Sequence, residues 1–471
     1  MPPPVAEKTT SRKRRKPSPG RKTRGRPKPK VGARPPGPRA PDPEFVALQR
    51  VRRAGLSRAD LDSLSRTLTW SRPVAPAIES QARSATRRLH VVMVGWEWPP
   101  NHTGGLGVHC FEVCKELTRM GHRVTFLTPF RGPFTNLPGV TIRFPGDAPK
   151  AGTWYPPAYW SGETPDSPFH DAMDGYNAWI SELRGIGHFD LVHVHDWFGT
   201  IGGRELARHG RVPMVLTVHS TEYDRSLGNP WEHILQREQY GIDHADRVIA
   251  VSRHLRQQLI DRYHAVPERV RVIYNAVRPS DRLRPLKESQ QIVLYLGRLA
   301  AMKGVDTFLR AAARVAPTVP DALFVVAGEG PEFPHLLDLA THLGVADRVL
   351  FLGKVTEDER AVLLASASVF VLPSVVEPFG IAALEAMAAG VPTIVSKTSG
   401  VAEIAQHVFA IDFWDVDEFA SRIAELLEYP VLRAAMGEGG RWDALKEGWP
   451  ERALQTVGVY QEAILSSAKP R

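Results

Sequence analysis

The stretch that decides the fold is VFVLPSVVEPFGIAALEAMAAGVPTIV, residues 369–395. Apolar runs at 369–372 and 393–395 enclose a run of small, helix-forming residues at 381–389. Short apolar runs separated by a helix predict parallel strands that are buried on both faces of a sheet. Two carboxylates, Glu377 before the helix and Glu385 inside it, stand in an otherwise uncharged stretch. We therefore expect a strand–helix–strand unit whose helix begins at a ligand site.

The same alternation extends in both directions along the chain. Strands are expected in one series at 292–296, 323–327, 349–352, 369–372 and 393–395, with helices at 305–315, 333–343, 357–366 and 381–389. An earlier series has strands at 89–94, 124–128, 140–144, 191–194, 214–218, 248–251 and 270–274, with helices at 108–120, 200–209 and 253–263. Two such series predict an α/β protein of two facing, doubly wound domains with a ligand cleft between them. A single large barrel is disfavoured, because the spacing is uneven and the ligand loops fall at two distant places.

This pattern divides the chain into segments. We expect a disordered, basic, proline-rich tail at 1–43, a helical connector at 44–87, a first Rossmann-like domain at 88–280 that 451–467 completes, a second at 281–450, and a short tail at 468–471. The final helix is expected after the break at Trp449-Pro450.

Charge is concentrated in the tail. The 471 residues carry a net charge of +9, but residues 1–40 hold 14 Lys/Arg and one acid, so the remaining chain is mildly acidic. Ten prolines in this segment prevent a packed core, and we expect at most non-specific contact with polyanions. Arg24-Gly25-Arg26-Pro27 resembles an AT-hook, a short minor-groove motif, and a solvated tail is the alternative.

Composition excludes several classes of protein. Cys110 and Cys114 are the only cysteines, which excludes a disulfide-rich secreted scaffold. No apolar run approaches the length of a transmembrane segment, and the N-terminus lacks the apolar core of a signal peptide. We expect a cytoplasmic protein.

Two glycine-rich loops follow predicted strands. The first, PPNHTGGLG at 99–107, places Gly104, Gly105 and Gly107 just before a helix, where free amides bind anionic oxygens. A plain structural turn is the alternative there. The second, GRLAAMKG at 297–304, carries Arg298 and Lys303, two cations that suit a diphosphate. Arg298 paired with a carboxylate at the rim is the alternative for that loop.

Several motifs together resemble the retaining glycosyltransferases of family 4, which have the GT-B fold. The resemblance covers about residues 88–467. It rests on Gly-Gly-Leu-Gly at 104–107, Val-His-Val-His-Asp at 192–196, residues 248–252, the two cations at 298 and 303, Gly-Glu-Gly-Pro at 328–331 and the glutamates at 377 and 385. It implies an ADP- or UDP-sugar donor that the second domain mainly holds.

The resemblance also implies roles for individual residues. Arg298 and Lys303 bind the donor diphosphate, together with the glycine loop, and Glu385 binds the ribose hydroxyls. Glu377 and the backbone amides of Phe379, Gly380 and Ile381 hold the donor sugar. His195 contacts the transferred sugar near the reacting carbon, so His195 and Glu377 are the expected catalytic residues. The family further implies that the donor's α configuration is retained.

No metal or other cofactor is expected. His193, His195 and Asp196 resemble part of a metal site, but no Cys or Glu cluster completes it, and a structural core histidine is a further alternative. Asp415-Val416-Asp417 is interpreted as a helix cap and not as a metal-binding motif. Arg298, Lys303 and helix dipoles would then neutralise the leaving diphosphate.

The acceptor is less constrained by the sequence. Segments 96–100, 219–226 and 395–403 are similar to bacterial glycogen or starch synthase-like proteins, which favours glucosyl transfer to an α-glucan. His102-Thr103-Gly104-Gly105-Leu106 departs from the Lys-Thr-Gly-Gly-Leu of bacterial glycogen synthases, so mannosyl or other hexosyl transfer to a small or lipid-linked acceptor is the runner-up.

An aromatic segment is the candidate acceptor site. Its residues, which stack on sugar rings or else pack onto their own domain, are Trp154, Tyr155, Tyr159 and Trp160. Among other classes, a nicotinamide dehydrogenase lacks its G-x-G-x-x-G motif here, and no lysine is an obvious pyridoxal site for a phosphorylase. The non-enzyme alternative is a nucleic-acid-binding tail on an inactive enzyme body.

Overall fold

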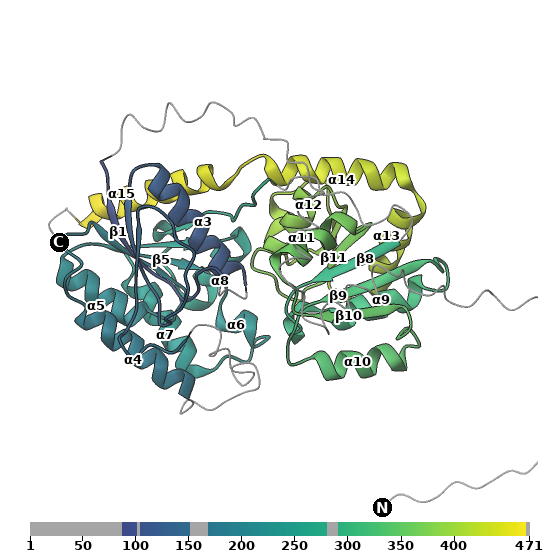
Figure 1. Ribbon diagram of the computed structural model, residues 1–471, viewed down its shortest axis with the longest axis horizontal. Helices are drawn as coiled ribbons and strands as arrows, with labels where there is room; N and C mark the ends of the chain where they lie inside the picture. Colours follow the sequence, from purple (N-terminus) through teal and green to yellow (C-terminus); the bar gives the residue numbers. More distant parts are fainter. Residues whose placement is uncertain (1–86, 101–103, 151–167, 280–290, 468–471) are drawn as a thin grey trace, which may run out of the picture. The chain divides into compact units, whose positions relative to one another are not determined.

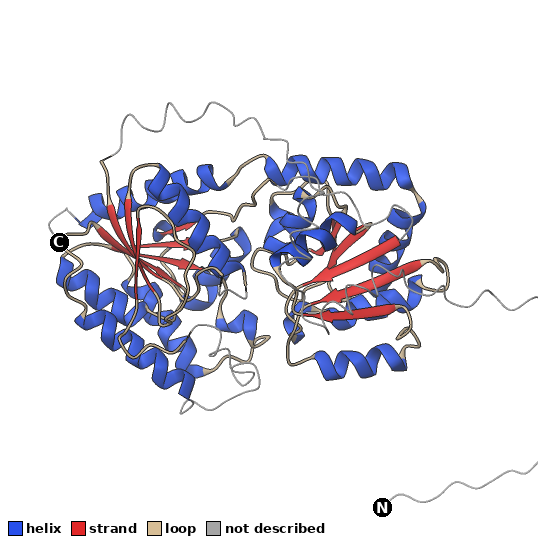
Figure 2. Cartoon of the chain, viewed as in Figure 1, coloured by secondary structure: helices blue, strands red, loops and turns tan. Residues whose placement is uncertain are grey.

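Two parallel sheets organise the protein, and they appear red in Figure 2. The computed structural model describes residues 87–100, 104–150, 168–279 and 291–467. The first sheet has the order β3-β2-β1-β4-β5-β6-β7 and the second β10-β9-β8-β11-β12-β13. The strands of the first are β1 (His90–Val94), β2 (Arg123–Leu127), β3 (Val140–Arg143), β4 (Leu191–His195), β5 (Met214–Val218), β6 (Arg247–Ala250) and β7 (Val270–Val272). Those of the second are β8 (Gln291–Leu296), β9 (Ala322–Ala327), β10 (Val349–Gly353), β11 (Val369–Leu372), β12 (Thr393–Ser396) and β13 (Phe409–Ile411).

The central strands are apolar because helices cover both faces of each sheet. Every residue of β1, β4, β5 and β11 is buried. All the strand pairs run parallel, and the register places Val92 opposite both Thr125 and Val192. In each sheet the strand order reverses once, between β1 and β4 and between β8 and β11. This is the doubly wound arrangement that the sequence predicts, and ligands bind such sheets where the order reverses.

Helices occupy the connections between the strands, and α4 and α5 lie side by side (Figure 1). Those of the first half are α3 (Gly105–Arg119), α4 (Pro168–Glu182), α5 (Thr200–Gly210), α6 (Glu222–Arg225), α7 (Glu232–His244), α8 (Arg253–Tyr263) and the 3-10 turn η3 (Pro267–Arg269). Those of the second half are η4 (Ala301–Lys303), α9 (Val305–Val315), α10 (Phe333–His342), α11 (Glu357–Ser366), α12 (Ile381–Ala388), η5 (Gly400–Glu403), α13 (Val416–Glu428) and α14 (Pro430–Leu445).

The last helix, α15 (Trp449–Ser467), packs against α3, β5 and β6 of the first half. It begins at Trp449, two residues earlier than expected, because Pro450 is accommodated in its first turn. Its buried side chains, among them Val457 and Tyr460, belong to the same core as Leu117 of α3. The C-terminal segment therefore completes the hydrophobic core of the first half.

Several smaller expectations have a structural outcome. Asp415 caps α13, since its Oδ1 accepts a hydrogen bond from the Glu418 amide at 3.0 Å. None of the described helices combines the length and apolar character that a membrane crossing requires. The predicted tail and connector, His102 and Thr103, and the aromatic segment with Trp154, Tyr155, Tyr159 and Trp160 lie outside the described residues.

Candidate active site

Both groups of candidate residues lie where a strand order reverses. In the first sheet, Gly104 follows β1 and His195 ends β4, the two strands on either side of the reversal. In the second sheet, Arg298 follows β8 and Glu377 follows β11. The loops beyond two such strands diverge to opposite faces of the sheet, which leaves a crevice at their carboxyl ends. Each sheet therefore presents one group of side chains at its crevice.

Lys303 and Glu377 form an ion pair in the second half. Lys303 Nζ lies 2.6 Å from Glu377 Oε2, and the two side chains are only 14% and 10% exposed. The Ser374 hydroxyl donates a second hydrogen bond to the same oxygen at 3.3 Å. The family resemblance implies a diphosphate role for Lys303 and a sugar role for Glu377, and the structure brings these two groups into direct contact.

Backbone geometry holds these two residues together. Gly304, directly after Lys303, has φ +64°, and a Cβ at this position would lie 2.0 Å from the carbonyl oxygen of Pro373. Only glycine permits so close an approach. The amide of Val375 donates to the Met302 carbonyl at 2.9 Å, so η4 and the loop before Glu377 are joined by backbone hydrogen bonds.

Hydrogen bonds from the segment at 399–401 hold the backbone just before the N-terminus of α12. Gly380 is the N-cap with φ +101°, and no side chain caps this helix. The Phe379 carbonyl accepts hydrogen bonds from the Val401 amide at 2.8 Å and the Ser399 hydroxyl at 3.0 Å. Helix-start amides without a side-chain acceptor suit phosphate or sugar oxygens, particularly with the positive end of the helix dipole behind them. Ile381 is the first residue of α12.

Glu385 has a partner that the sequence did not reveal. Arg360 of α11 donates to Glu385 Oε2, and each of these side chains is about one-fifth exposed. Burial lowers the pKa of the Arg360 guanidinium.

Arg298 lies near Tyr295, whose hydroxyl donates to the Arg298 carbonyl at 2.9 Å. The pKa of Tyr295 is raised by burial and by the negative charge of Glu377, and the charge of Arg298 opposes that rise.

Histidines cluster at the strand ends of the first half. His195 Nδ1 lies 3.1 Å from Nε2 of His219, which directly follows the adjacent strand β5. Burial is the main cause that lowers the pKa of both imidazoles, to about 3 for His219 and well below the usual value for His195. Both rings are therefore neutral at physiological pH, and each offers a lone pair to a donor.

His193 packs beside His195 and is held by the last helix. The two rings lie 4.2 Å apart between centroids, which agrees with the expectation that residues two apart on a strand share a face. His193 Nδ1 is hydrogen-bonded to the Tyr460 hydroxyl of α15, and its Nε2 to the Thr217 hydroxyl, each at 2.7 Å. His193 is therefore a fully hydrogen-bonded core histidine, whereas His195 Nε2 is buried without a hydrogen-bond partner.

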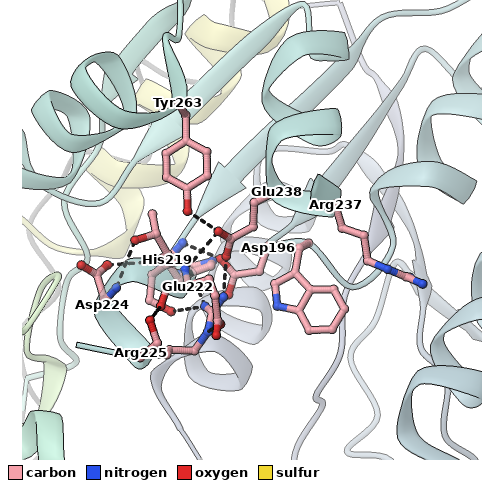
Figure 3. Close-up of polar contacts among 12 residues, drawn as sticks. Asp196, His219, Glu222, Asp224, Arg225, Arg237, Glu238 and Tyr263 are labelled. Atoms are coloured by element: carbon pink, nitrogen blue, oxygen red, sulfur yellow. Dashed lines mark hydrogen bonds and ion pairs between the residues drawn. The ribbon is translucent and has the colours of Figure 1, made fainter. Parts of the chain in front are cut away.

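A buried polar network fixes the loop that carries His219 (Figure 3). Asp196 has φ +53°, and its Oδ1 accepts a hydrogen bond from the His219 amide at 2.7 Å. Burial raises the pKa of Asp196 to about 6, and the nearby charge of Arg225 opposes that rise. Arg225 in turn donates to Glu222 and Glu238, and Glu238 also accepts from the Tyr263 hydroxyl. The network thereby ties α6, α7 and α8 to the strand ends at the crevice.

The glycine loop is more helical than expected. Gly104 is the N-cap of α3, and Gly105 and Gly107 lie inside the first turn of the helix, which begins three residues before the expected start. No side chain caps this helix at Gly104. Its first-turn amides therefore have no side-chain cap, which an anion site at a helix start requires.

Sequence reasoning missed four residues at these crevices. They are His109 of α3, His219, Asn275 and Arg360. A signal existed for His219, because it directly follows a predicted strand next to the strand that ends with His195. His109 Nδ1 and Asn275 Oδ1 are hydrogen-bonded at 2.7 Å across 166 residues, a contact that no local pattern indicates.

Comparisons with known proteins identify the family. The model of "Glycosyltransferase Family 4" matches residues 103–281 and that of "Glycosyl transferases group 1" matches residues 278–443. An uncharacterized glycosyltransferase of Methanocaldococcus jannaschii is 31% identical over 402 residues, which cover 80% of this chain and 99% of that protein. The chain belongs to the family 4 glycosyltransferases. The segment matched by the group 1 model contains every candidate residue of the second crevice, from Arg298 to Glu385.

Other relatives carry names that differ in the activity they describe. A D-inositol 3-phosphate glycosyltransferase of Thermobispora bispora is 30% identical, with 77% of this chain and 90% of that protein covered. A glycogen synthase of Mycobacterium tuberculosis is 28% identical, with 81% and 97% covered.

A solved structure supports the fold. Sucrose-phosphate synthase of Thermosynechococcus elongatus matches with a TM-score of 0.69 at 21% identity, over 80% of this chain and all of that one. The GT-B fold class expected from the sequence is therefore confirmed, and the protein is a glycosyltransferase.

Proposed function

We propose that this glycosyltransferase moves a glucosyl group from ADP- or UDP-glucose to an α-glucan and retains the α configuration. The kinship with a glycogen synthase supports the glucan acceptor. An Anabaena protein solved in complex with UDP-glucose, at TM-score 0.62 and 18% identity over 80% of this chain and all of that one, has the same fold. This neighbour supports a nucleotide-sugar donor.

The observation that carries the proposal is the Lys303–Glu377 pair beside the uncapped start of α12. In a purely structural ion pair, the two charges would interact only with each other and not with a ligand. Here Lys303 lies in the loop that also contains Arg298, and the pair adjoins helix amides that attract an anion. We assign Arg298 and Lys303 to the diphosphate, with Gly104, Gly105 and Gly107 contributing from the first half.

Hydrogen-bond acceptors and donors for the sugar follow from the same loop. Glu377 accepts from hydroxyls of the donor sugar, while the amides of Phe379, Gly380 and Ile381 donate to its oxygens. Glu385 accepts from the ribose hydroxyls, and its partner Arg360 orients the carboxylate. With the sugar and the ribose bound by these groups, Arg298 and Lys303 are available to bind the diphosphate.

His195 is the group that we place next to the reacting carbon. The bond from the anomeric carbon to the diphosphate oxygen breaks, the acceptor oxygen bonds to the same face of that carbon, and the acceptor proton passes to the leaving diphosphate. Positive charge develops on the sugar in this step, so a neutral imidazole destabilises it less than a histidinium would. The lowered pKa of His195 keeps it neutral. Arg298, Lys303 and the α12 dipole carry the leaving-group charge without a metal ion.

The test is a turnover screen of the purified full-length protein. ADP-glucose, UDP-glucose, GDP-mannose and UDP-N-acetylglucosamine are each supplied with glycogen, and proton NMR measures the anomeric signal of the product. An α-linked product from a glucose nucleotide is expected. A β-linked product, or turnover of GDP-mannose alone, would contradict the proposal. Glu377→Gln is the matched loss-of-function control.

A small phosphorylated molecule is the second candidate class of acceptor. The D-inositol 3-phosphate glycosyltransferase relatives, at about 30% identity, favour a small phosphorylated acceptor. Parallel assays with inositol phosphate and with glycogen distinguish the two, since only one should accept the sugar. The wider runner-up, mannosyl or other hexosyl transfer to a small or lipid-linked acceptor, is tested by the same donor screen.

The remaining proposals concern the two halves of the chain, the aromatic segment and the N-terminal tail. We assign 88–280, completed by 451–467, to acceptor binding and 281–450 to donor binding. Trp160→Ala should raise the KM of the acceptor and spare that of the donor if the aromatic segment binds sugar. Deletion of residues 1–40 should leave turnover unchanged; loss of turnover would contradict a merely polyanion-attracting tail. The cytoplasmic location stays a prediction.

A further inference from the structure

A cluster of three histidines in the first crevice is not explained by sugar binding alone. One ring nitrogen from each of His109, His195 and His219 lies within 4.8 Å of the corresponding nitrogens of the other two. The histidines come from three separate elements: helix α3, the end of β4 and the residue after β5. His109 and His195 are buried, and His219 is partly buried.

His109 is oriented as metal-binding histidines are. Its Nδ1 is hydrogen-bonded to Asn275 Oδ1 at 2.7 Å. A carbonyl oxygen only accepts, so Nδ1 carries the proton and Nε2 carries the lone pair. A second partner of this kind fixes the tautomer and the ring angle of a histidine ligand. Trp449 of α15 packs edge-on against the same ring, with 5.5 Å between centroids.

His195 and His219 have the spacing of two ligands on one ion. Their Nδ1 and Nε2 atoms are 3.1 Å apart. Two nitrogens that are each about 2.0–2.1 Å from a tetrahedral ion lie roughly 3.3 Å apart. The other ring nitrogen of His195, Nε2, is buried and has no hydrogen-bond partner. In the tautomer in which His195 Nδ1 donates to His219, an ion between the two rings displaces that proton to Nε2 of the same ring, and binding then requires no change in net protonation.

Burial disfavours the protonated form of all three imidazoles. The pKa values of His109, His195 and His219 are all lowered, with burial as the largest cause in each case. A neutral imidazole binds a metal, whereas an imidazolium does not.

We propose that His109, His195 and His219 bind one divalent late first-row transition ion, of the class of Zn²⁺ or Co²⁺. Three imidazoles with an open fourth position are a donor set that zinc accepts, and imidazole favours Zn²⁺ over Mg²⁺ or Ca²⁺. The site differs from the diphosphate site, whose charges are Arg298 and Lys303. If His195 also contacts the transferred sugar, as the proposed function holds, the ion and the sugar exclude each other.

Cobalt alone tests the site directly. Purified full-length protein is titrated with Co²⁺ while visible absorption is recorded, and Zn²⁺ is then added to displace it. One Co²⁺ per chain is expected, with the intense absorption of a low-coordinate nitrogen site. His109→Gln and His219→Gln should each abolish this absorption. Asn275→Ala should weaken Co²⁺ binding about 10- to 100-fold, since it removes only the partner that orients His109.

Two controls make the result specific. His122→Gln removes another buried histidine of the first half that lies outside the cluster. It should leave Co²⁺ binding unchanged. His233→Gln tests the rival pair formed by His170 and His233, whose ring nitrogens approach to 2.9 Å. Circular dichroism checks the folding of every variant.

The proposal is overturned by three results. They are the absence of Co²⁺ binding in the wild-type protein, unchanged binding in folded His109→Gln and His219→Gln, and loss of binding only in His233→Gln. If those two cluster variants do not fold, Asn275→Ala decides: weaker binding supports the site and unchanged binding overturns it. UDP binding is measured separately, so failure of the donor assignment is distinguishable from failure of the metal site.

Discussion

Replacing Lys303 by methionine separates a structural ion pair from a diphosphate site. Methionine retains the unbranched shape and most of the length of the side chain and removes its charge. Lys303 Nζ lies 2.6 Å from Glu377 Oε2, and the side chains are 14% and 10% exposed. A charge-assisted hydrogen bond to the diphosphate contributes about 1.5–3 kcal/mol, so UDP should bind about 10- to 150-fold more weakly to Lys303→Met.

Lys303→Met should also lower the free energy of unfolding, and this loss depends on whether Glu377 keeps its charge. Lys303→Met leaves the Glu377 carboxylate unpaired, and for a fully buried pair this costs about 3–5 kcal/mol. The partial exposure here should reduce the loss to about 2–3 kcal/mol. Adding Glu377→Gln removes the orphaned charge, so the double variant should recover most of this stability. It should not recover UDP binding, because the diphosphate still lacks its cation.

Isothermal calorimetry with UDP and urea unfolding measure the two effects. Lys397→Met is the matched control, because Lys397 pairs with Asp412 at 2.7 Å but these side chains are 58% and 36% exposed. It should change stability by less than about 1 kcal/mol and leave UDP binding unchanged. Unchanged UDP affinity in folded Lys303→Met, or affinity restored in the double variant, would refute the diphosphate assignment.

Three further predictions concern the crevice residues. Burial lowers the pKa of His219 to about 3, so below pH 6.5 the unfolded chain gains a proton that the native chain does not. His219→Gln should therefore reduce the stability lost between pH 7.5 and 5, measured by urea unfolding, by about 2 kcal/mol; an unaltered pH profile would contradict this. Tyr460→Phe leaves His193 Nδ1 unpaired, so it should cost about 1–3 kcal/mol of stability and lower kcat while UDP affinity is preserved; an equal loss of UDP affinity would count against it. Arg360→Gln frees Glu385 and should weaken UDP binding but not pyrophosphate binding, whereas equal weakening of both would exclude a ribose role.

The placement of the candidate residues at the strand ends of the second half was largely predictable, because its signals are local. Arg298 and Lys303 stand five residues apart in one loop, and Glu377 and Glu385 flank one helix start. Each strand before these loops is apolar enough to be predicted, so the loops could be placed at the carboxyl edge of a sheet. Contact between Lys303 and Glu377 could not be predicted, since it spans 74 residues and depends on the close packing at Gly304.

Two elements of the second half escaped prediction for physical reasons. Strand β13 has only three residues, Phe409–Ile411, and three residues are too few to show the alternation of apolar and polar side chains that predicts a strand. Helix α14 contains glycines, which lower helix propensity. A Cβ at Gly437 would lie 2.3 Å from the Gly390 carbonyl oxygen, so the glycine is required by the packing of α14 on the end of α12. Tertiary contact overrides local propensity at this position.

The first crevice depends on long-range convergence. His195 was recognised from its motif, but His109, His219 and Asn275 reach it from segments that no short pattern connects. Tyr460 contributes from the last helix, 267 residues beyond His193. A histidine on a helix or beside a strand is ordinarily a solvated or core residue, so its role becomes visible only when its neighbours in space are known.

The two crevices differ in charge, and this difference matches the charge that the proposed reaction would develop. The second crevice holds paired ions, Lys303 with Glu377 and Arg360 with Glu385. The first presents imidazoles such as His195, whose burial keeps them neutral. A diphosphate that gains negative charge is stabilised by fixed cations, whereas a sugar carbon that gains positive charge is destabilised by any cation nearby. Under the proposed assignments, this separation of cationic from neutral groups would stabilise both ends of the breaking bond, and a metal ion bound by the histidines would place positive charge beside the sugar carbon. On this reasoning, metal binding and glycosyl transfer compete for the same side chains.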